Sequence, residues 1–185
     1  MLDALYKETK EKMEKSVEAV QREFSTVRTG KATPQLLDSV RVDAYGSSMP
    51  LNQLATISAP EPRLLVVQAY DKSTVGDIIK AIQVADLGFN PSADGQLIRI
   101  PVPALNEERR QQLVKHCKDI AEKGRIAIRN ARRDANDAAK KAQKDKEISE
   151  DQEADAHTRI QELTDDHIKK IDDLLERKEK DLMEV

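Results

Sequence analysis

The sequence is poor in the residues that build disulfides, aromatic binding surfaces and membrane spans. It has one cysteine, no tryptophan, two phenylalanines and three tyrosines in 185 residues. A single cysteine excludes an internal disulfide, and so few aromatic side chains leave no platform on which nucleic-acid bases could stack. No apolar run approaches the roughly 20 residues that cross a bilayer, and the charged N-terminal stretch lacks the apolar core of a signal peptide. We therefore predict a cytoplasmic protein with no membrane partner.

The residue patterns of common catalytic and metal centres are also missing. The sequence has no glycine-rich phosphate loop and no G-x-S-x-G nucleophile motif. His116, His157 and His167 are scattered and Cys117 stands alone, so no metal-binding spacing is formed. We therefore predict no catalytic residue, no metal site and no cofactor, and we do not expect an enzyme. Cys117 and His167 fall on the apolar stripes of their predicted helices and are expected to be core residues.

Proline and glycine are confined almost entirely to the middle of the chain. All seven prolines and four of the six glycines lie between residues 31 and 104. The flanks instead carry apolar residues at three- and four-residue spacing between charged ones, as amphipathic helices do. With 35% charged residues, the composition is typical of a helical bundle. Three long helices are predicted, over residues 2–28, 106–148 and 149–185.

Residues with strong positional preferences mark the ends of these helices. Gly30 is placed to end the first helix, and Arg28 would lie in its last turn beside the negative end of the helix dipole. Asn106, followed by two glutamates, is a suitable N-cap for the second helix. Ser149 and Gln152 have the spacing of a capping box, which predicts the start of the third.

The middle segment predicts about four strands and one helix. Arg63 to Tyr70 is nearly continuously apolar, so this strand is expected to be central in a sheet. Ser73 or Thr74 can cap a helix that ends near Leu87 and Gly88. The other strands are predicted at residues 40–45, 54–59 and 97–100, with turns at residues 46–50 and 90–95.

These elements predict an α+β fold. We expect an elongated three-helix bundle built from residues 1–30 and 105–185, because three amphipathic helices can bury their apolar stripes against one another. A small β/α/β sandwich domain, residues 31–104, is inserted between the first and second helices. Two chain segments must then join the domains, and a hinge is expected near residues 29–32 and 103–106. Its residues would be Gly30, Lys31, Pro103, Ala104, Leu105 and Asn106.

The predicted second helix separates its side chains into an apolar and a cationic arc. At about 100° per residue, the apolar arc contains Leu113, Cys117, Ile120, Ala121, Ala127, Ile128, Ala131, Ala135, Ala138 and Ala142. The cationic arc contains Arg125, Arg129, Arg132 and Arg133, together with Asn136. Four guanidinium groups this close repel one another unless an anion lies opposite, and their planar fork suits phosphate. The alternative is a solvated face with pairs along the helix, such as Arg129 with Glu122 and Arg133 with Asp137.

The overall net charge of −3 conceals an asymmetry along the chain. Residues 105–148 contain 13 Lys and Arg against 8 Asp and Glu, a net of +5. Residues 149–185 contain 6 against 13, a net of −7. The segment charges keep a nucleic-acid partner open, and such a partner would be recognised by backbone and shape and not by base sequence.

Six motifs follow one another along the whole chain. They are Arg28-Thr29-Gly30-Lys31-Ala32, Tyr45-Gly46, Pro50-Leu51-Asn52-Gln53-Leu54-Ala55, Asp86-Leu87-Gly88-Phe89-Asn90-Pro91, Asn106-Glu107-Glu108-Arg109-Arg110 and Arg129-Asn130-Ala131-Arg132-Arg133-Asp134. In this order they resemble the bacterial ribosome recycling factor family. Two positions depart from the family pattern: Ala44, where a second tyrosine is more usual, and Ala131, where a bulkier aliphatic residue is. Both concern local packing, and neither is one of the arginines.

The resemblance implies a translation factor that binds the ribosome after peptide release. With elongation factor G and GTP, such proteins split the ribosome into subunits and free messenger and transfer RNA. The bundle, somewhat like a transfer RNA in shape, would lie on the large subunit, and the small domain would swing about the hinge. Arg129, Arg132 and Arg133 are then expected contacts to large-subunit ribosomal RNA, with Arg125 in the same arc. Further basic residues match the family near the hinge: Arg28, Lys31, Arg109 and Arg110.

Two other functions are compatible with a basic helix face. A nucleic-acid chaperone would bind duplex DNA and RNA alike, whereas the family resemblance predicts a preference for large ribosomal subunits. A coiled-coil adaptor would pair the basic helix with an acidic protein, without a steep salt dependence of ribosome binding. The inserted domain and the broken apolar stripes favour a monomer whose helices pack within one chain.

Overall fold

The computed structural model describes residues 1–85 and 87–184, so Asp86 of the resemblance motif and the last residue of the predicted bundle lie outside the described residues. The chain divides into two compact units. The first comprises Met1–Arg28 and Glu107–Val185, and the second comprises Thr29–Asn106. The predicted fold class, α+β with three long helices and a small sheet-containing segment, is confirmed.

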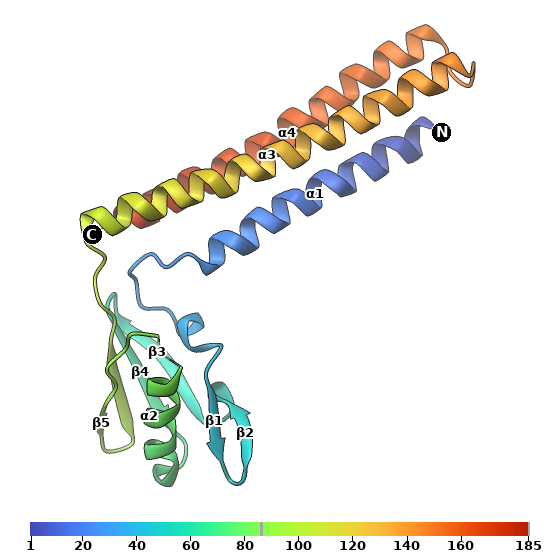
Figure 1. The fold of residues 1–185 in the computed structure, drawn as a ribbon. Coiled ribbons are helices and arrows are strands. Elements are labelled where there is room, and N and C mark those ends of the chain that lie inside the picture. Colours follow the sequence, from blue (N-terminus) through green and yellow to red (C-terminus); the bar gives the residue numbers. More distant parts are fainter. Residues whose placement is uncertain (86, 185) are drawn as a thin grey trace. The chain divides into compact units, whose positions relative to one another are not determined.

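The first unit is a bundle of three helices (Figure 1). They are α1 (Leu2–Thr26), α3 (Glu107–Lys144) and α4 (Glu150–Met183). The predicted capping box is confirmed, because the Gln152 N–H donates to Ser149 Oγ at 3.1 Å and the Ser149 N–H donates to Gln152 Oε1 at 2.8 Å. None of the helices of the described chain is both long and apolar enough to cross a bilayer.

Two helix ends differ from the prediction. Helix α1 ends at Thr26 and is followed by extended Val27, so Gly30 does not cap it and Arg28 lies beyond its last turn. Helix α3 ends at Lys144, before the predicted Ile148. Lys146 adopts φ +59°, and the N–H groups of Lys146 and Glu147 donate to Gln143 O and Ala142 O. This left-handed C-terminal motif reverses the chain into α4 without a glycine, so sequence rules based on glycine missed it.

The buried line of α3 confirms most of the predicted apolar arc. Apart from the adjacent Ile120 and Ala121, it steps by three or four residues from Cys117 to Ala142. Ala127, predicted in the arc, is exposed, and Ala139 is buried where Ala138 was expected. Gly124, which the prediction omitted, lies on the buried line because it contributes no side chain and lets two helices approach. The buried residues of α3 are Leu113, Cys117, Ile120, Ala121, Gly124, Ile128, Ala131, Ala135, Ala139 and Ala142.

Cys117 and His167 are core residues of the bundle, as predicted. Cys117 has no exposed surface, and His167 is 2% exposed with Nδ1 at 2.6 Å from Leu163 O. Burial raises the pKa of the Cys117 thiol, and the nearby Glu179 acts in the same direction against the opposing effect of Lys178. The thiol is therefore held in its unreactive, protonated form in the native state.

We expect Cys117 to react with a disulfide reagent such as dithionitrobenzoate far more slowly than a small free thiol at pH 8. Labelling should need opening of the bundle, so its rate should rise steeply with urea. Because the folded pKa is raised, this group's contribution to stability is complete below the unfolded thiol's pKa and is lost as pH rises through the folded value. Rapid, urea-independent labelling in native buffer would contradict the burial of the thiol.

The second unit contains two antiparallel sheets and a helix (Figure 1). Strands β1 (Arg41–Ala44) and β2 (Ser47–Pro50) form a hairpin. The larger sheet has the order β3-β4-β6-β5, with β4 between β3 and β6, so the predicted central strand is confirmed. Helix α2 spans Val75–Val84. The strands of the larger sheet are β3 (Ala55–Glu61), β4 (Leu64–Ala69), β5 (Ser92–Asp94) and β6 (Leu97–Pro101).

The described residues form six strands where about four were predicted. Residues 46–50 and 90–95 were expected to be turns, but β2 and β5 lie within them. Both belong to hairpins with two-residue loops, since Ala44 pairs with Ser47 and Asp94 pairs with Leu97. Such tight loops leave the flanking polar residues free to pair. Strand β3 also runs on through Pro60, which an edge strand tolerates because the missing N–H costs no ladder bond.

The core of the second unit lies between α2 and the sheets. Its least exposed members come from the central strands, from β1 and from the inner face of α2. Thr74 is the N-cap of α2 but makes no side-chain capping bond there. Instead the Asp71 carboxylate accepts the Ser73 N–H at 2.9 Å and starts the preceding 3-10 turn, Lys72–Thr74. The fully buried aliphatic residues include Val42, Leu65, Val67, Ile78, Ile98 and Ile100.

The two segments that leave the second unit are anchored to the turn between β3 and β4. The Ala32 N–H donates to Pro62 O at 2.7 Å, and the Val102 N–H donates to Arg63 O at 2.8 Å. Gly30 has φ +78°, and a Cβ there would lie 3.1 Å from Leu105 Cγ. Gly30 therefore lets the entering and leaving segments of the unit run close together.

We expect Gly30→Ala to loosen this contact. The left-handed backbone disfavours a Cβ by roughly 1–2 kcal/mol, and Leu105 must also shift. Amide hydrogen exchange at residues 29–32 and at residues 102, 104 and 105 should accelerate, above all at the hydrogen-bonded amides of Ala32 and Val102. Gly76→Ala is the control, because its Cβ meets nothing within 4 Å inside α2 and alanine should stabilise that helix. Unchanged exchange in the Gly30 variant would show that the glycine is dispensable there.

Candidate nucleic-acid interface

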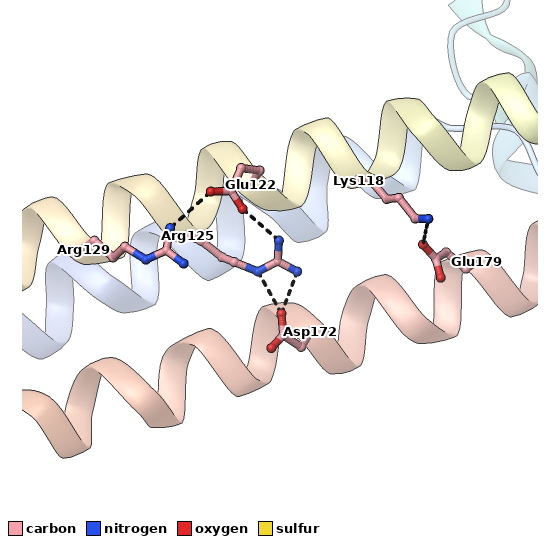
Figure 2. Close-up of polar contacts among 6 residues, drawn as sticks. All are labelled: Lys118, Glu122, Arg125, Arg129, Asp172 and Glu179. Atoms are coloured by element: carbon pink, nitrogen blue, oxygen red, sulfur yellow. Dashed lines mark hydrogen bonds and ion pairs between the residues drawn. The ribbon is translucent and has the colours of Figure 1, made fainter.

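Three cations of α3 face α4 at seven-residue spacing, close to two helical turns. Lys118 Nζ lies 3.9 Å from Glu179 Oε1. Arg125 lies one repeat further on, with Nη2 at 2.7 Å and Nε at 2.8 Å from Asp172 Oδ1 (Figure 2). The third cation, Arg132, meets a neutral amide instead, with Nη1 at 3.5 Å from Gln161 Oε1. Lys118 and Arg125 therefore each face a carboxylate of α4, whereas Arg132 faces an amide.

Glu122 bridges two of the predicted arginines. Its Oε2 accepts Arg125 Nη1 and its Oε1 accepts Arg129 Nη1, both at 3.1 Å (Figure 2). These hydrogen bonds, from Arg125 first and Arg129 second, hold the pKa of Glu122 below its usual value. The carboxylate is therefore ionised at neutral pH. The pair of Arg129 with Glu122, one of the alternatives raised by the sequence, is thus present.

The charges within the predicted arginine face are unequally balanced. Glu122 and Asp172 together cancel the two charges of Arg125 and Arg129. Neither Arg132 nor Arg133 has an ion-pair partner among the described residues, and the Gln161 amide that contacts Arg132 is itself held by Asp165 at 2.8 Å. Arg133 is exposed. The uncompensated positive charge therefore lies at Arg132 and Arg133, where an external anion gains most.

Arg109 and Arg110, two of the other predicted basic residues, lie near the start of α3, away from this face. Arg110 comes 15 residues before Arg125, about 22 Å along the helix axis. Its Nε is buried and has no hydrogen-bond partner among the described residues, whereas Arg109 Nη1 donates to Gln112 Oε1 at 3.2 Å. Arg28 ends the first segment of the bundle unit, and Lys31 belongs to the second unit.

Sequence reasoning missed the partners that α4 supplies. Asp172 and Gln161 become neighbours of the arginines only through the antiparallel register of α3 and α4. Asn136 was placed in the cationic arc, and its Oδ1 lies 2.8 Å from His157 Nδ1. The signal available in advance was Glu122, three and seven residues before its two arginines. Among residues 1–85 and 87–184, no three acidic, histidine or cysteine side chains converge as metal ligands would.

Arg125 is largely covered, with 19% of its side chain exposed, so we expect Arg125→Ala to affect stability. The decrease should be about 1 kcal/mol, since Asp172 is half-exposed and solvent screens the pair. A double-mutant cycle with Asp172→Asn, followed by urea unfolding, should give a coupling of about 0.5–1 kcal/mol. Arg133→Ala, whose side chain has no ion pair within the described chain, serves as the control and should leave stability unchanged. Additive effects in the cycle would show that the ion pair does not brace α3 against α4.

The three-helix bundle, the inserted α/β unit and the arginine face of α3 define the class of this protein: an α+β bundle protein with a cationic helix face. The family model described as Ribosome recycling factor matches residues 20–183. The chain belongs to the ribosome recycling factor family.

Similar proteins match the chain over all or nearly all of its length. It is 53% identical over 178 residues to the ribosome-recycling factor of Bacillus subtilis, covering 96% of each chain. It is 54% identical over 185 residues to that of Macrococcus caseolyticus, covering 100% of each. A solution structure of a ribosome recycling factor matches with TM-score 0.77 at 40% identity, covering 100% of this chain and 98% of that one.

A second solved structure comes from work on a ribosomal complex. It matches with TM-score 0.65 at 46% identity and covers 100% of both chains. It is described as models for the Thermus thermophilus ribosome recycling factor and the Escherichia coli elongation factor G bound to the Escherichia coli post-termination complex.

Proposed function

We propose that this protein is a cytoplasmic translation factor that binds the post-termination ribosome. Together with elongation factor G and GTP, it splits the ribosome into subunits and releases messenger and transfer RNA. The observation that carries this proposal is the pair of uncompensated arginines, Arg132 and Arg133, on a long rigid helix. Family membership and the ribosome-bound relative support the identity of the partner.

The arginine face is proposed to hold the bundle on ribosomal RNA of the large subunit. Planar guanidinium groups bind phosphate oxygens in pairs, and the charge pattern favours the stretch from Arg129 to Arg133. Interactions of this kind fix position without reading base sequence. Arg28, Lys31, Arg109 and Arg110 are proposed as secondary contacts. Arg125 differs from the other predicted arginines, because its donors are already bound to the carboxylates of Glu122 and Asp172.

The two units are proposed to act as jointed domains, residues 1–30 with 105–185 and residues 31–104. The hinge would lie near residues 29–32 and 103–106. Gly30, with its positive φ, supports this proposal. The hydrogen bonds of Ala32 and Val102 to the turn between β3 and β4 support it as well, because they attach both segments to the second unit at these residues. Elongation factor G is proposed to push on the second domain, while the helices of the bundle transmit the force as a stiff lever. The factor acts as a monomer and without a cofactor or catalytic residue of its own.

The test is a splitting assay on post-termination ribosomes with elongation factor G and GTP. Subunits are separated by sedimentation, with and without this protein. We expect free subunits to accumulate only when all three components are present. Binding to duplex DNA and RNA with the affinity found for large subunits, and no splitting, would favour a nucleic-acid chaperone instead.

A further inference from the structure

A series of ion pairs ends at Arg129 on α3 and engages one nitrogen of its guanidinium group. Asp172 on α4 holds Arg125, Arg125 holds Glu122 and Glu122 holds Arg129, at distances of 2.7 to 3.1 Å (Figure 2). Among the described residues, Arg129 is engaged only through Nη1. Its Nε and Nη2, the edge that takes two oxygens side by side, remain available.

We infer that Glu122 is a positioning residue for phosphate binding by Arg129. This rests on the proposed function, because the phosphate belongs to ribosomal RNA of the large subunit. Only 19% of the Arg125 side chain is exposed, and Asp172 of the neighbouring helix accepts hydrogen bonds from two of its nitrogens, so Arg125 is the best-held member of this series of ion pairs. Glu122 binds both Arg125 and Arg129, which lies two helical turns further along α3, and so restricts the conformations of the Arg129 side chain. That side chain is 42% exposed and can reach an external phosphate.

Two opposite effects of Glu122 on affinity can be weighed. Its negative charge would repel a phosphate on the far edge of Arg129, but at roughly 7 Å in salt-screened water this lowers affinity by only about 1.5-fold. Holding a flexible side chain in its binding conformation strengthens binding about two- to tenfold, because the side chain is already ordered before the phosphate arrives. Positioning therefore outweighs repulsion, and the two effects predict opposite signs on removal of the carboxylate.

The experiment measures binding of the full chain to large ribosomal subunits across a salt series. Glu122→Ala should bind more weakly, by up to about sevenfold, although it makes the protein more positive. Its salt slope should stay that of wild type because the number of bound phosphates is unchanged. Glu122→Gln should lie between, since its amide has one acceptor oxygen for the two arginines. The matched control is Asp119→Ala, an exposed acid one turn away, which should bind as wild type or slightly more tightly.

A double-mutant cycle with Arg129→Ala separates positioning from a general structural role. In the Arg129→Ala background, Glu122→Ala should weaken binding no further, whereas a destabilised helix would weaken binding in either background. Helical content at 222 nm should stay unchanged, because Asp172 still holds Arg125.

If Glu122→Ala binds as tightly as wild type or more tightly, the inference is overturned while the proposed function stays intact. Normal binding by Arg129→Ala would overturn it as well. Absence of any salt-dependent binding by wild type would overturn both the inference and the proposed function.

Discussion

Replacing Arg132 and Arg133 together by alanine should weaken binding to large ribosomal subunits by about 100-fold. A hydrogen bond to a charged partner contributes about 1.5 kcal/mol, or about tenfold for each arginine. The slope of log affinity against log salt should fall by about 0.9 for each phosphate that the variant no longer binds. These two residues should contribute most because neither has an ion-pair partner among the described residues, whereas Arg125 is largely covered and Arg129 offers only one edge of its guanidinium group. Co-sedimentation over a salt series measures both quantities.

The control removes the same charge elsewhere in the bundle. Arg22 on α1 and Arg177 on α4 are both exposed, and their double alanine variant should keep most of the affinity and the salt slope. If both double variants bind equally weakly, binding depends on net charge and not on this face of α3. Circular dichroism should show full helical content in all variants, since Arg132 and Arg133 lie outside the core.

Replacing Gly124 by valine should destabilise the bundle by about 3 kcal/mol, the upper end of the range for overpacking. A Cβ at this position would overlap Val20 Cγ2 and lie 2.9 Å from Ile171 Cδ1, so it collides with both neighbouring helices. The Val20 side chain is β-branched and cannot easily rotate away. Thermal unfolding followed at 222 nm should show a midpoint lowered by about 10 °C or more.

Two further variants test the steric cause of this destabilisation. Ala127→Val changes an exposed position of the same helix and should cost only about 0.5 kcal/mol through helix propensity. Gly124→Ala combined with Val20→Ala removes the clashing methyl groups, so the pair should be less unstable than the sum of the single variants by about 1 kcal/mol. Equal destabilisation by Gly124→Val and Ala127→Val would show that the helices can move apart freely.

Local rules recovered the elements that depend on short-range pattern. The capping box at Ser149 and the apolar strand at the centre of the larger sheet were both predictable. Prediction failed where a residue acted against its usual preference. Lys146 took the left-handed position that glycine normally occupies, and the polar residues of β2 and β5 paired because their hairpin loops were only two residues long.

The candidate site shows the same division. The arginines share one face because the helical period alone places them there, and Glu122 could be found three and seven residues before its partners. Arg125 looked equivalent to Arg132 in the sequence, with the same helix, charge and arc. The structure distinguishes them, since Arg125 meets the carboxylate of Asp172 and Arg132 meets the amide of Gln161.

The sequence by itself determined the three helices, the inserted segment rich in proline and glycine, the arginine face and the family resemblance. All of these depend on residue order within one stretch of chain, through periodicity, turn preference and motif. Only the tertiary structure decided which arginines lack a carboxylate partner on α4 and why Gly124 must be small. Both depend on the register between helices, which brings together residues as far apart in the chain as Arg132 and Gln161, 29 positions, and Arg125 and Asp172, 47 positions. That register is set by packing of the whole bundle.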